Sequence, residues 1–239
     1  MDNDNFISAI HNYCDRWCER CEFTSRCRVF AMEAEMAIDE DAGDEAVVRH
    51  LTNILHDAKT MLEQKAAEFG IDLSGIDDEK FAADEQRHRS TVESSVLCQM
   101  AEKYAADMEP VLVSREEWLA ADLTDEDVLG EVIGVLLWYQ YFIAAKIDRG
   151  VGGAIDFDGS EDTEEINDPQ SDANGSIKAA LIAIERSLLA WTYLLCGDNE
   201  RTIRPLMVIL EELKLSAEAR FPHAWDFIRP GFDEIETVM

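Results

Sequence analysis

The sequence predicts an all-α fold, in which four or five long helices form an up-down helical bundle beside an N-terminal cysteine-rich metal-binding knot. Three observations lead to this prediction. Long stretches carry apolar residues at three- and four-residue spacing, which is typical of amphipathic helices. Only five prolines and twelve glycines interrupt the 239 residues. No alternating run of apolar and polar residues, bounded by turn residues, indicates a strand.

The first predicted helices flank the cysteines. Residues 5–18 are expected to form a short helix that enters the cysteine cluster, and residues 28–38 a second helix that leaves it, before an acidic turn. We therefore assign residues 1–40 to an N-terminal helix-knuckle-helix unit.

Longer amphipathic or apolar segments follow. The predicted helices span residues 45–69, 78–108, 125–149, 177–195 and 200–220. Proline lacks a backbone donor, so Pro110 is expected to stop the second of them, whereas Pro205 stands in the tolerant first turns of the last. Ser114 to Glu117 indicates a capping box for a further short helix. We assign residues 41–221 to the bundle and residues 222–239 to an irregular C-terminal tail packed over it.

One long connection, residues 150–174, is predicted to be an acidic, solvated loop. It begins with three glycines in four residues, from Gly150 to Gly153. Asp156, Asp158 and Asp162 have part of the spacing of a calcium loop. The glycine falls at the fourth position of that pattern, and Asn167 stands where a bidentate glutamate is needed, so a calcium site is not expected.

The charge balance excludes some partners. Asp and Glu number 51 against 21 Lys and Arg, which gives a formal net charge of −30. A field of this sign repels phosphate backbones and anionic headgroups, so neither nucleic acid nor a membrane surface is an expected partner. A protein partner or self-association remains open, and no small-molecule ligand is identified.

The N-terminal residues indicate the compartment. They lack the basic and apolar regions of a signal peptide, so the expected location is the cytoplasm. Residues 128–147 are long enough to span a membrane, but Glu131, Gln140 and Lys146 interrupt them, and we expect a core helix instead. In a reducing compartment, clustered cysteines are expected to be metal ligands rather than disulfides.

Four of the six cysteines lie within fourteen residues. Cys14, Cys18, Cys21 and Cys27 follow the spacing C-x3-C-x2-C-x5-C. Cys18 and Cys21 have the spacing of a metal knuckle, and the next six residues allow the chain to bring Cys27 back to the same site. Neighbouring arginines are expected to lower the thiol pKa values and favour metal capture. The four cysteines are therefore the predicted metal site.

The sequence leaves two metals open, a [4Fe-4S] cluster or zinc. Structural zinc sites typically combine two C-x2-C or Cys/His pairs, whereas one such pair is present here, with His11 as a possible substitute ligand. Iron–sulfur sites accept compact runs of this kind. Over about ten residues, C-x2-C-x-Phe-x3-C resembles the cysteine knots of iron–sulfur nucleases and of auxiliary clusters in radical enzymes. This resemblance implies no shared fold or activity.

The first three cysteines also match the spacing of radical S-adenosylmethionine enzymes. Arg20 stands where that family usually has an aromatic residue, and a fourth cysteine follows closely. No β/α barrel is predicted downstream, so this interpretation is rejected.

The predicted bundle contains weaker candidates for a metal site and for a ligand pocket. Glu85 and His88 share a helix face and could form half of a di-iron site, with Glu131 and Glu185 as further carboxylates. The second Glu-x-x-His that such a site needs is missing, because Leu188 follows Glu185 by three residues. Aromatic residues of the two apolar helices could surround a ligand pocket, although core packing is the more common role of such residues. They are Trp138, Tyr139, Tyr141, Trp191 and Tyr193.

The sequence therefore predicts a metal-binding helical protein that serves as an accessory, interaction or redox-sensing module, with no identifiable catalytic motif. The alternative is a metal-dependent or iron–sulfur redox enzyme with a site between the bundle helices. Cys98 and Cys196, each in an apolar run, are expected to be inert core residues.

Overall fold

The computed structural model describes residues 5–35, 44–71, 78–113, 126–156, 159–195 and 200–234. Within these ranges the prediction of an all-α protein is confirmed: no strand is present, and Ile155 and Glu161 form an isolated β-bridge. The α-helices are α1 (Ile10–Tyr13), α2 (Arg28–Glu35), α3 (Asp44–Glu68), α4 (Asp78–Glu93), α5 (Val96–Val113), α7 (Glu126–Gly153), α8 (Thr163–Asn167), α9 (Asp172–Leu194) and α10 (Glu200–Arg220). The 3-10 turns are η2 (Cys18–Arg20), η3 (Thr24–Arg26) and η6 (Ala224–Asp226).

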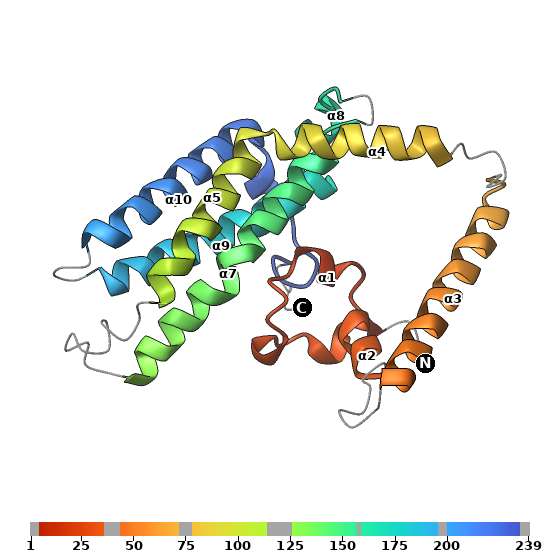
Figure 1. The fold of residues 1–239 in the computed structure, drawn as a ribbon, viewed down its shortest axis with the longest axis horizontal. Helices are drawn as coiled ribbons and strands as arrows, with labels where there is room; N and C mark the ends of the chain where they lie inside the picture. The colour runs from red at the N-terminus through yellow and green to blue at the C-terminus, as the bar shows by residue number, and fades with distance from the viewer. Residues whose placement is uncertain are drawn as a thin grey trace, which may run out of the picture.

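Helices α5, α7, α9 and α10 pack around one apolar core, which we call the four-helix core (Figure 1). The most extensive packing joins α7 to α9, and α10 contacts both α5 and α9. Trp191 and Tyr104 are among the largest fully buried side chains, and the Trp191 Nε1–H donates to the Tyr104 hydroxyl over 3.0 Å. This bond satisfies polar atoms that would otherwise destabilise the core.

The long helix predicted over residues 78–108 is divided in two. Helix α4 ends at Glu93, and α5 starts at Val96. Between them the Ser94 hydroxyl donates to the Thr91 carbonyl, a local bond that competes with the helical ladder.

The predicted stop at Pro110 was wrong, because α5 continues to Val113. Pro110 and Ala106 are exposed, so water can solvate the carbonyl that loses its helical donor. Val111 and Leu112 are buried in the core, and their burial stabilises the last turn.

The loop predicted over residues 150–174 is mostly helical. Helix α7 continues through Gly153, α8 follows, and α9 begins at Asp172. A Cβ at Gly150 would lie 2.6 Å from the Ile177 side chain, so this glycine serves the close packing of α7 on α9 rather than a turn. Asp162 caps α8 by accepting from the backbone of Glu164 and Glu165.

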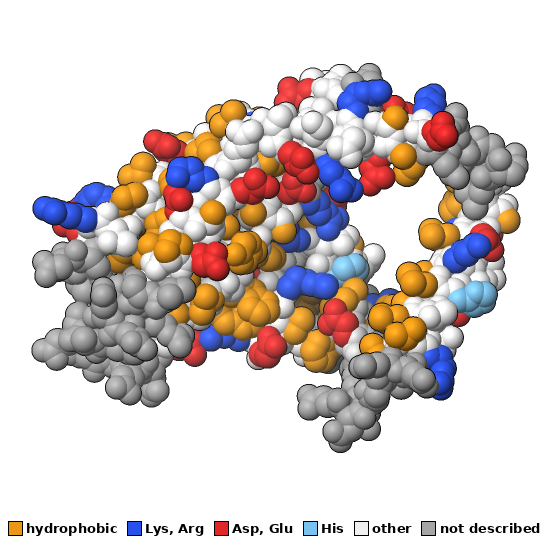
Figure 2. Space-filling view, viewed as in Figure 1, with side chains coloured by type: hydrophobic (Ala, Val, Ile, Leu, Met, Phe, Trp, Pro, Cys, Tyr) orange, Lys and Arg blue, Asp and Glu red, His pale blue; other side chains and the backbone are white. Residues whose placement is uncertain are grey.

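Helix α3 matches its predicted range closely but does not join the four-helix core. Among the described residues, no other helix packs extensively on α3. It stands apart from the core, connected through α4, as Figure 1 shows. Figure 2 shows hydrophobic side chains along α3, on the side that faces the opening between it and the rest of the molecule. The expected burial of its apolar side is not found.

The bounds predicted for the last helix are confirmed. Helix α10 spans Glu200–Arg220, as predicted. After it, η6 packs on α9, and Phe221 and Ala224 join the apolar core. The short helix expected at Ser114 lies outside the described residues.

Helix α7 is the one described helix that could cross a membrane by length and composition. Within its apolar stretch Val128–Gly153, a window of 18 residues has a mean hydropathy of 1.6, and a third of that window is buried. The core helix of a protein that never meets a membrane meets the same criteria, so the absence of a membrane partner stays a prediction.

Candidate metal centre

The four clustered cysteines lie in residues 5–35, which we call the cysteine segment. Cys14 follows α1, Cys18 opens η2, Cys21 follows η2, and Cys27 follows η3. The expected helix over residues 5–18 is reduced to the single turn of α1. Cys14 and Arg16 leave the helical conformation, with Arg16 at a φ of 60°. Cys14 and Cys18 are therefore not on one helix face.

The fold nevertheless brings the four cysteines together. Cys14, Cys18, Cys21 and Cys27 all line one cavity of about 20 Å³. All four are free thiols and partly buried. Ile10, Phe30 and Phe232 also line this cavity, whereas His11 does not. His11 is therefore not placed to replace a thiolate.

The donor set has the chemistry of a metal centre, but not the geometry of a bound single ion. Within the described part of the chain, no three His, Cys, Asp or Glu side chains converge closely enough to hold one ion. A zinc ion needs four donors about 2.3 Å from one point. The thiols instead stand around a shared space. The Phe23 N–H donates to the Cys21 sulfur over 3.4 Å, a contact that stabilises negative charge on sulfur.

The expected lowering by neighbouring arginines is not found for the pKa values of Cys14 and Cys18. Burial raises the pKa of Cys14, and the opposing charge of Arg16 is too weak to reverse this. Burial, followed by the charge of Cys14, raises the pKa of Cys18. Arg16 pairs with Glu33 over 3.5 Å, and Arg20 with Glu131 over 2.5 Å, so these cations are partly neutralised by carboxylates.

Asp15 attaches the cysteine segment to α7 and α9. Arg186 of α9 donates to the Asp15 carboxylate over 2.7 Å, and the Tyr139 hydroxyl of α7 donates to it over 2.9 Å. The Trp138 Nε1–H donates to the Asp15 carbonyl over 2.8 Å. Burial, then the charge of Asp15, raises the pKa of Tyr139 to about 12, although a hydrogen bond from Arg186 opposes the shift. Tyr139 is therefore a neutral donor at physiological pH.

Aromatic stacking reinforces this attachment. Trp17 stacks on Trp138 with ring centroids 5.0 Å apart. The Arg20 guanidinium lies 3.8 Å from the Trp17 ring centroid and also reaches Glu131 on α7. Cation–π and ion-pair contacts of this kind are individually modest, but together they fix the orientation of the segment.

A second set of contacts, made by Tyr13, holds the cysteine segment close to Asp15. The Tyr13 hydroxyl donates to Asp172 over 2.9 Å, and Arg149 donates two bonds to the same carboxylate. Tyr13 also packs on Phe227, with ring centroids 4.5 Å apart. A Cβ at Gly175 would lie 2.5 Å from the Tyr13 ring, so only glycine allows this approach. Helix α9 thus presents a surface shaped for the segment.

The C-terminal tail completes the wall of the cavity. Phe232 packs edge-on against Phe23, with ring centroids 5.0 Å apart. Gly231, at a φ of 78°, lies beside Ile7 and Ile10. Residues from both ends of the chain therefore enclose the cysteines.

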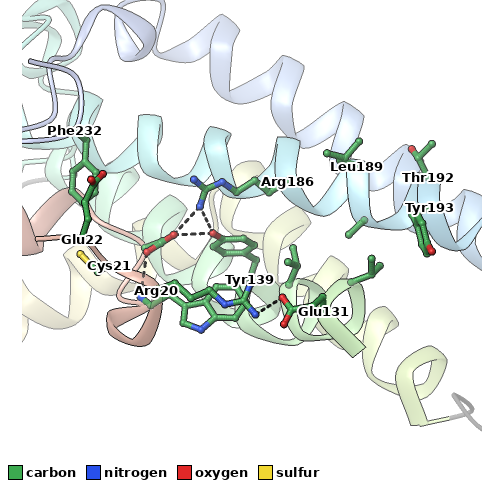
Figure 3. Close-up of a pocket in the computed structure, with 15 residues that line it drawn as sticks. Arg20, Cys21, Glu22, Glu131, Tyr139, Arg186, Leu189, Thr192, Tyr193 and Phe232 are labelled. Atoms are coloured by element: carbon green, nitrogen blue, oxygen red, sulfur yellow. Dashed lines mark hydrogen bonds and ion pairs between the residues drawn. The ribbon is translucent and has the colours of Figure 1, made fainter. Parts of the chain in front are cut away.

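A larger groove lies beside the cysteine cavity. It has a volume of about 900 Å³ and runs between the cysteine segment, α7 and α9. Arg186, Tyr139, Arg20 and Glu131 form its polar end, and Leu189 and Tyr193 lie farther along α9 (Figure 3). Cys21 lines both spaces, so the groove reaches the cysteine cluster.

The other metal candidates do not come together. The two carboxylates Glu85 and Glu185 pair with Arg89 and Lys214 respectively. His88 Nε2 lies 3.0 Å from the Gly152 carbonyl oxygen, in a structural contact with the end of α7. Of the calcium-like aspartates, Asp162 is the cap of α8, and Asp158 lies outside the described residues.

The aromatic pocket expected between the two apolar helices takes another form. Trp191 is core, and Tyr141 is exposed. Trp138 and Tyr139 instead receive the cysteine segment, and Tyr193 lines the groove. Cys98 is buried, and burial raises its pKa to about 12, which agrees with an inert core residue. Cys196 lies outside the described residues.

Sequence reasoning missed the role of Asp15. One signal was present: Arg186 interrupts a strongly apolar helix, where a charge needs a partner. Its partner could not be identified without the fold. Searches against protein-family models, curated proteins and solved structures each give no match for this chain.

Proposed function

We propose that Cys14, Cys18, Cys21 and Cys27 hold a [4Fe-4S] cluster, and that the protein is an accessory or redox-sensing module of the cytoplasm. One observation carries the proposal: all four clustered thiols line the same small cavity. A cluster distributes its cysteine ligands over four irons, whereas zinc draws them to one point. The compact run of cysteines, with one C-x2-C pair where structural zinc sites typically combine two such pairs, favours the cluster over zinc.

The surrounding residues suit a redox centre. When bound, such a cluster supplies one-electron oxidation and reduction. Ile10, Phe30 and Phe232 limit the access of water to the thiols, and the Phe23 N–H stabilises charge on the Cys21 sulfur. Asp15, next to Cys14, contacts both α7 and α9. A change of conformation at the cysteines would therefore alter contacts with the four-helix core.

The test is metal and acid-labile sulfide analysis of untagged protein purified without oxygen. We expect about four irons and four sulfides per chain and absorption near ~400 nm. Cys18→Ser and Cys21→Ser should each lose the iron. Cys98→Ala is the matched control, because this thiol lies in the core and should leave the iron unchanged.

Two results would contradict this proposal. One zinc per chain in place of iron would make this a structural zinc site and remove the redox role. Wild-type and Cys18→Ser proteins that both lack metal would remove the metal centre altogether.

A second candidate function, a redox enzyme with its substrate beside the cysteines, is favoured by the groove that Cys21 shares with the cavity. Its volume lies within the range of small-molecule sites. Native mass spectrometry of the purified protein tests this. A retained small molecule that disappears in Leu189→Trp, which fills the groove, would favour the enzyme. Protein without any adduct would favour the accessory role.

A further inference from the structure

Helix α3 carries its apolar residues in a heptad pattern. Val48, Leu55 and Leu62 are seven residues apart, and Leu51 and Ala58 follow the first two of them by three. These five residues, at the a and d positions, form what we call the α3 seam. A repeat of seven residues keeps one stripe of a helix facing a supercoiled partner helix.

The α3 seam is exposed. The exposed fractions of its valine and three leucines range from 52% for Leu51 to 71% for Leu55. Within the described residues no helix of the same chain packs extensively on it. Contiguous apolar surface of this kind typically marks an interaction site.

We propose that the α3 seam pairs with the α3 seam of a second copy of this chain, as a two-stranded coiled coil. A heptad seam is self-complementary, because its a and d side chains fill the spaces between those of an identical seam. The repeat from Val48 to Leu62 covers about two heptads of the 25-residue helix α3.

The charge of α3 also favours a second copy of this chain as its partner. The chain as a whole carries −30, so two copies repel each other over most of their surfaces. Between Val47 and Leu62, by contrast, the single acidic residue Asp57 is accompanied by Arg49 and Lys59. This stretch is therefore the part of α3 that another copy can approach without net repulsion.

The pairing has a defined end. The next d position after Ala58 is Lys65, which forms an ion pair with Glu68 of its own helix over 2.5 Å. A charged d position weakens a coiled-coil core and helps to set its register. We therefore expect the contact to cover Val48 to Leu62 and to end before Lys65.

The experiment is light scattering coupled to size exclusion, together with sedimentation equilibrium, on the full-length chain. We expect a species of twice the 27.0 kDa chain mass. Leu55→Glu combined with Leu62→Glu should raise the dimer dissociation constant at least about 100-fold, because four buried leucines are lost per dimer.

The matched control is Asn53→Glu combined with Ala67→Glu, which adds the same charge on the opposite, exposed side of α3. This variant should remain a dimer. Far-ultraviolet circular dichroism and iron content should stay unchanged in both variants, which separates this proposal from the metal centre. A wild-type monomer at every concentration, or a seam variant that still dimerises, would overturn the proposal.

Discussion

Asp15 illustrates how much a single residue can depend on the fold. It follows a cysteine directly in the sequence, yet its function is to bind Arg186, which lies 171 residues away. It joins α7 and α9 to the cysteine segment through a carboxylate and a carbonyl. No local pattern identifies such a partner, because the distance between two residues in space is set by the packing of every element between them.

Gly175 is expected to be essential for the contact between α9 and the cysteine segment. A methyl group at this position would lie 2.5 Å from Tyr13 and 2.7 Å from Phe227, so both rings or the helix backbone must move. We expect Gly175→Ala to lower the free energy of unfolding by about 1–3 kcal/mol, measured by urea denaturation.

Gly130 is the control for that substitution, because a methyl group there meets nothing within 4 Å. Gly130→Ala, in an exposed part of α7, should raise the free energy of unfolding by about 0.5–1 kcal/mol through helix propensity. Equal effects of the two substitutions would mean that Gly175 does not serve close packing.

Asp233 is expected to make the stability of the tail depend on pH. Burial alone would raise its pKa, but hydrogen bonds from Arg229 and Lys178 outweigh burial and hold the pKa well below its ordinary value. The unfolded carboxyl has a pKa of about 3.9, so the stabilisation is complete above that pH and is lost as the pH falls below it.

Asp233→Asn tests this dependence. The variant should be less stable than wild type by about 2 kcal/mol at neutral pH, since it loses hydrogen bonds to charged groups. The difference, measured by urea denaturation at a series of pH values, should shrink below about pH 4. A difference that widened on acidification would contradict the assignment.

At the scale of elements, strongly periodic helices were predictable and short ones were not. Helix α10 has the predicted bounds, and α3 differs from its prediction by one residue at each end. In contrast, α1 is a single turn, where a helix over residues 5–18 was expected. Long amphipathic segments combine many weak local preferences that agree, whereas the backbone of the cysteine segment follows contacts made across the chain.

Two leucines of α10 provide a test of which side of the helix is core. Leu210 is fully buried and Leu215 is 66% exposed. We expect Leu210→Ala to lower the free energy of unfolding by about 2–5 kcal/mol, through lost burial and the remaining cavity. Leu215→Ala should change it by less than about 0.5 kcal/mol. Thermal and urea unfolding of both variants measure the difference. Similar losses of unfolding free energy in the two variants would show that α10 does not turn Leu210 toward the core and Leu215 toward solvent.

At the scale of the whole molecule, the cysteine segment depends on other parts of the protein. Ile10 is its single buried side chain among those described. The segment is held by α7, α9 and the tail, through Asp15, Tyr13 and Phe23. A segment with so little core of its own is a typical place for a metal that stabilises the fold.

Loss of the proposed metal should therefore unfold the segment locally. In hydrogen exchange with mass spectrometry, the amides of residues 5–35 should exchange faster in Cys18→Ser than in wild type, while those of α7 and α9 stay protected. Cys98→Ala serves as the control, in which the four clustered cysteines are unchanged. Uniform loss of protection across the chain would instead indicate that the segment and the four-helix core unfold together.

The sequence by itself determined the helical class, the bounds of α3 and α10 to within one residue and the identity of the clustered thiols, because these depend on local periodicity and composition. The tertiary structure determined which residues of those elements contact one another and which remain exposed. Glycines 150 and 175 proved to be sites of close packing, and the apolar side of α3 proved to be exposed. The arrangement of four thiols around one cavity also required residues from both ends of the chain. Such contacts join residues far apart in sequence, and only the packing of the complete chain specifies which of them meet.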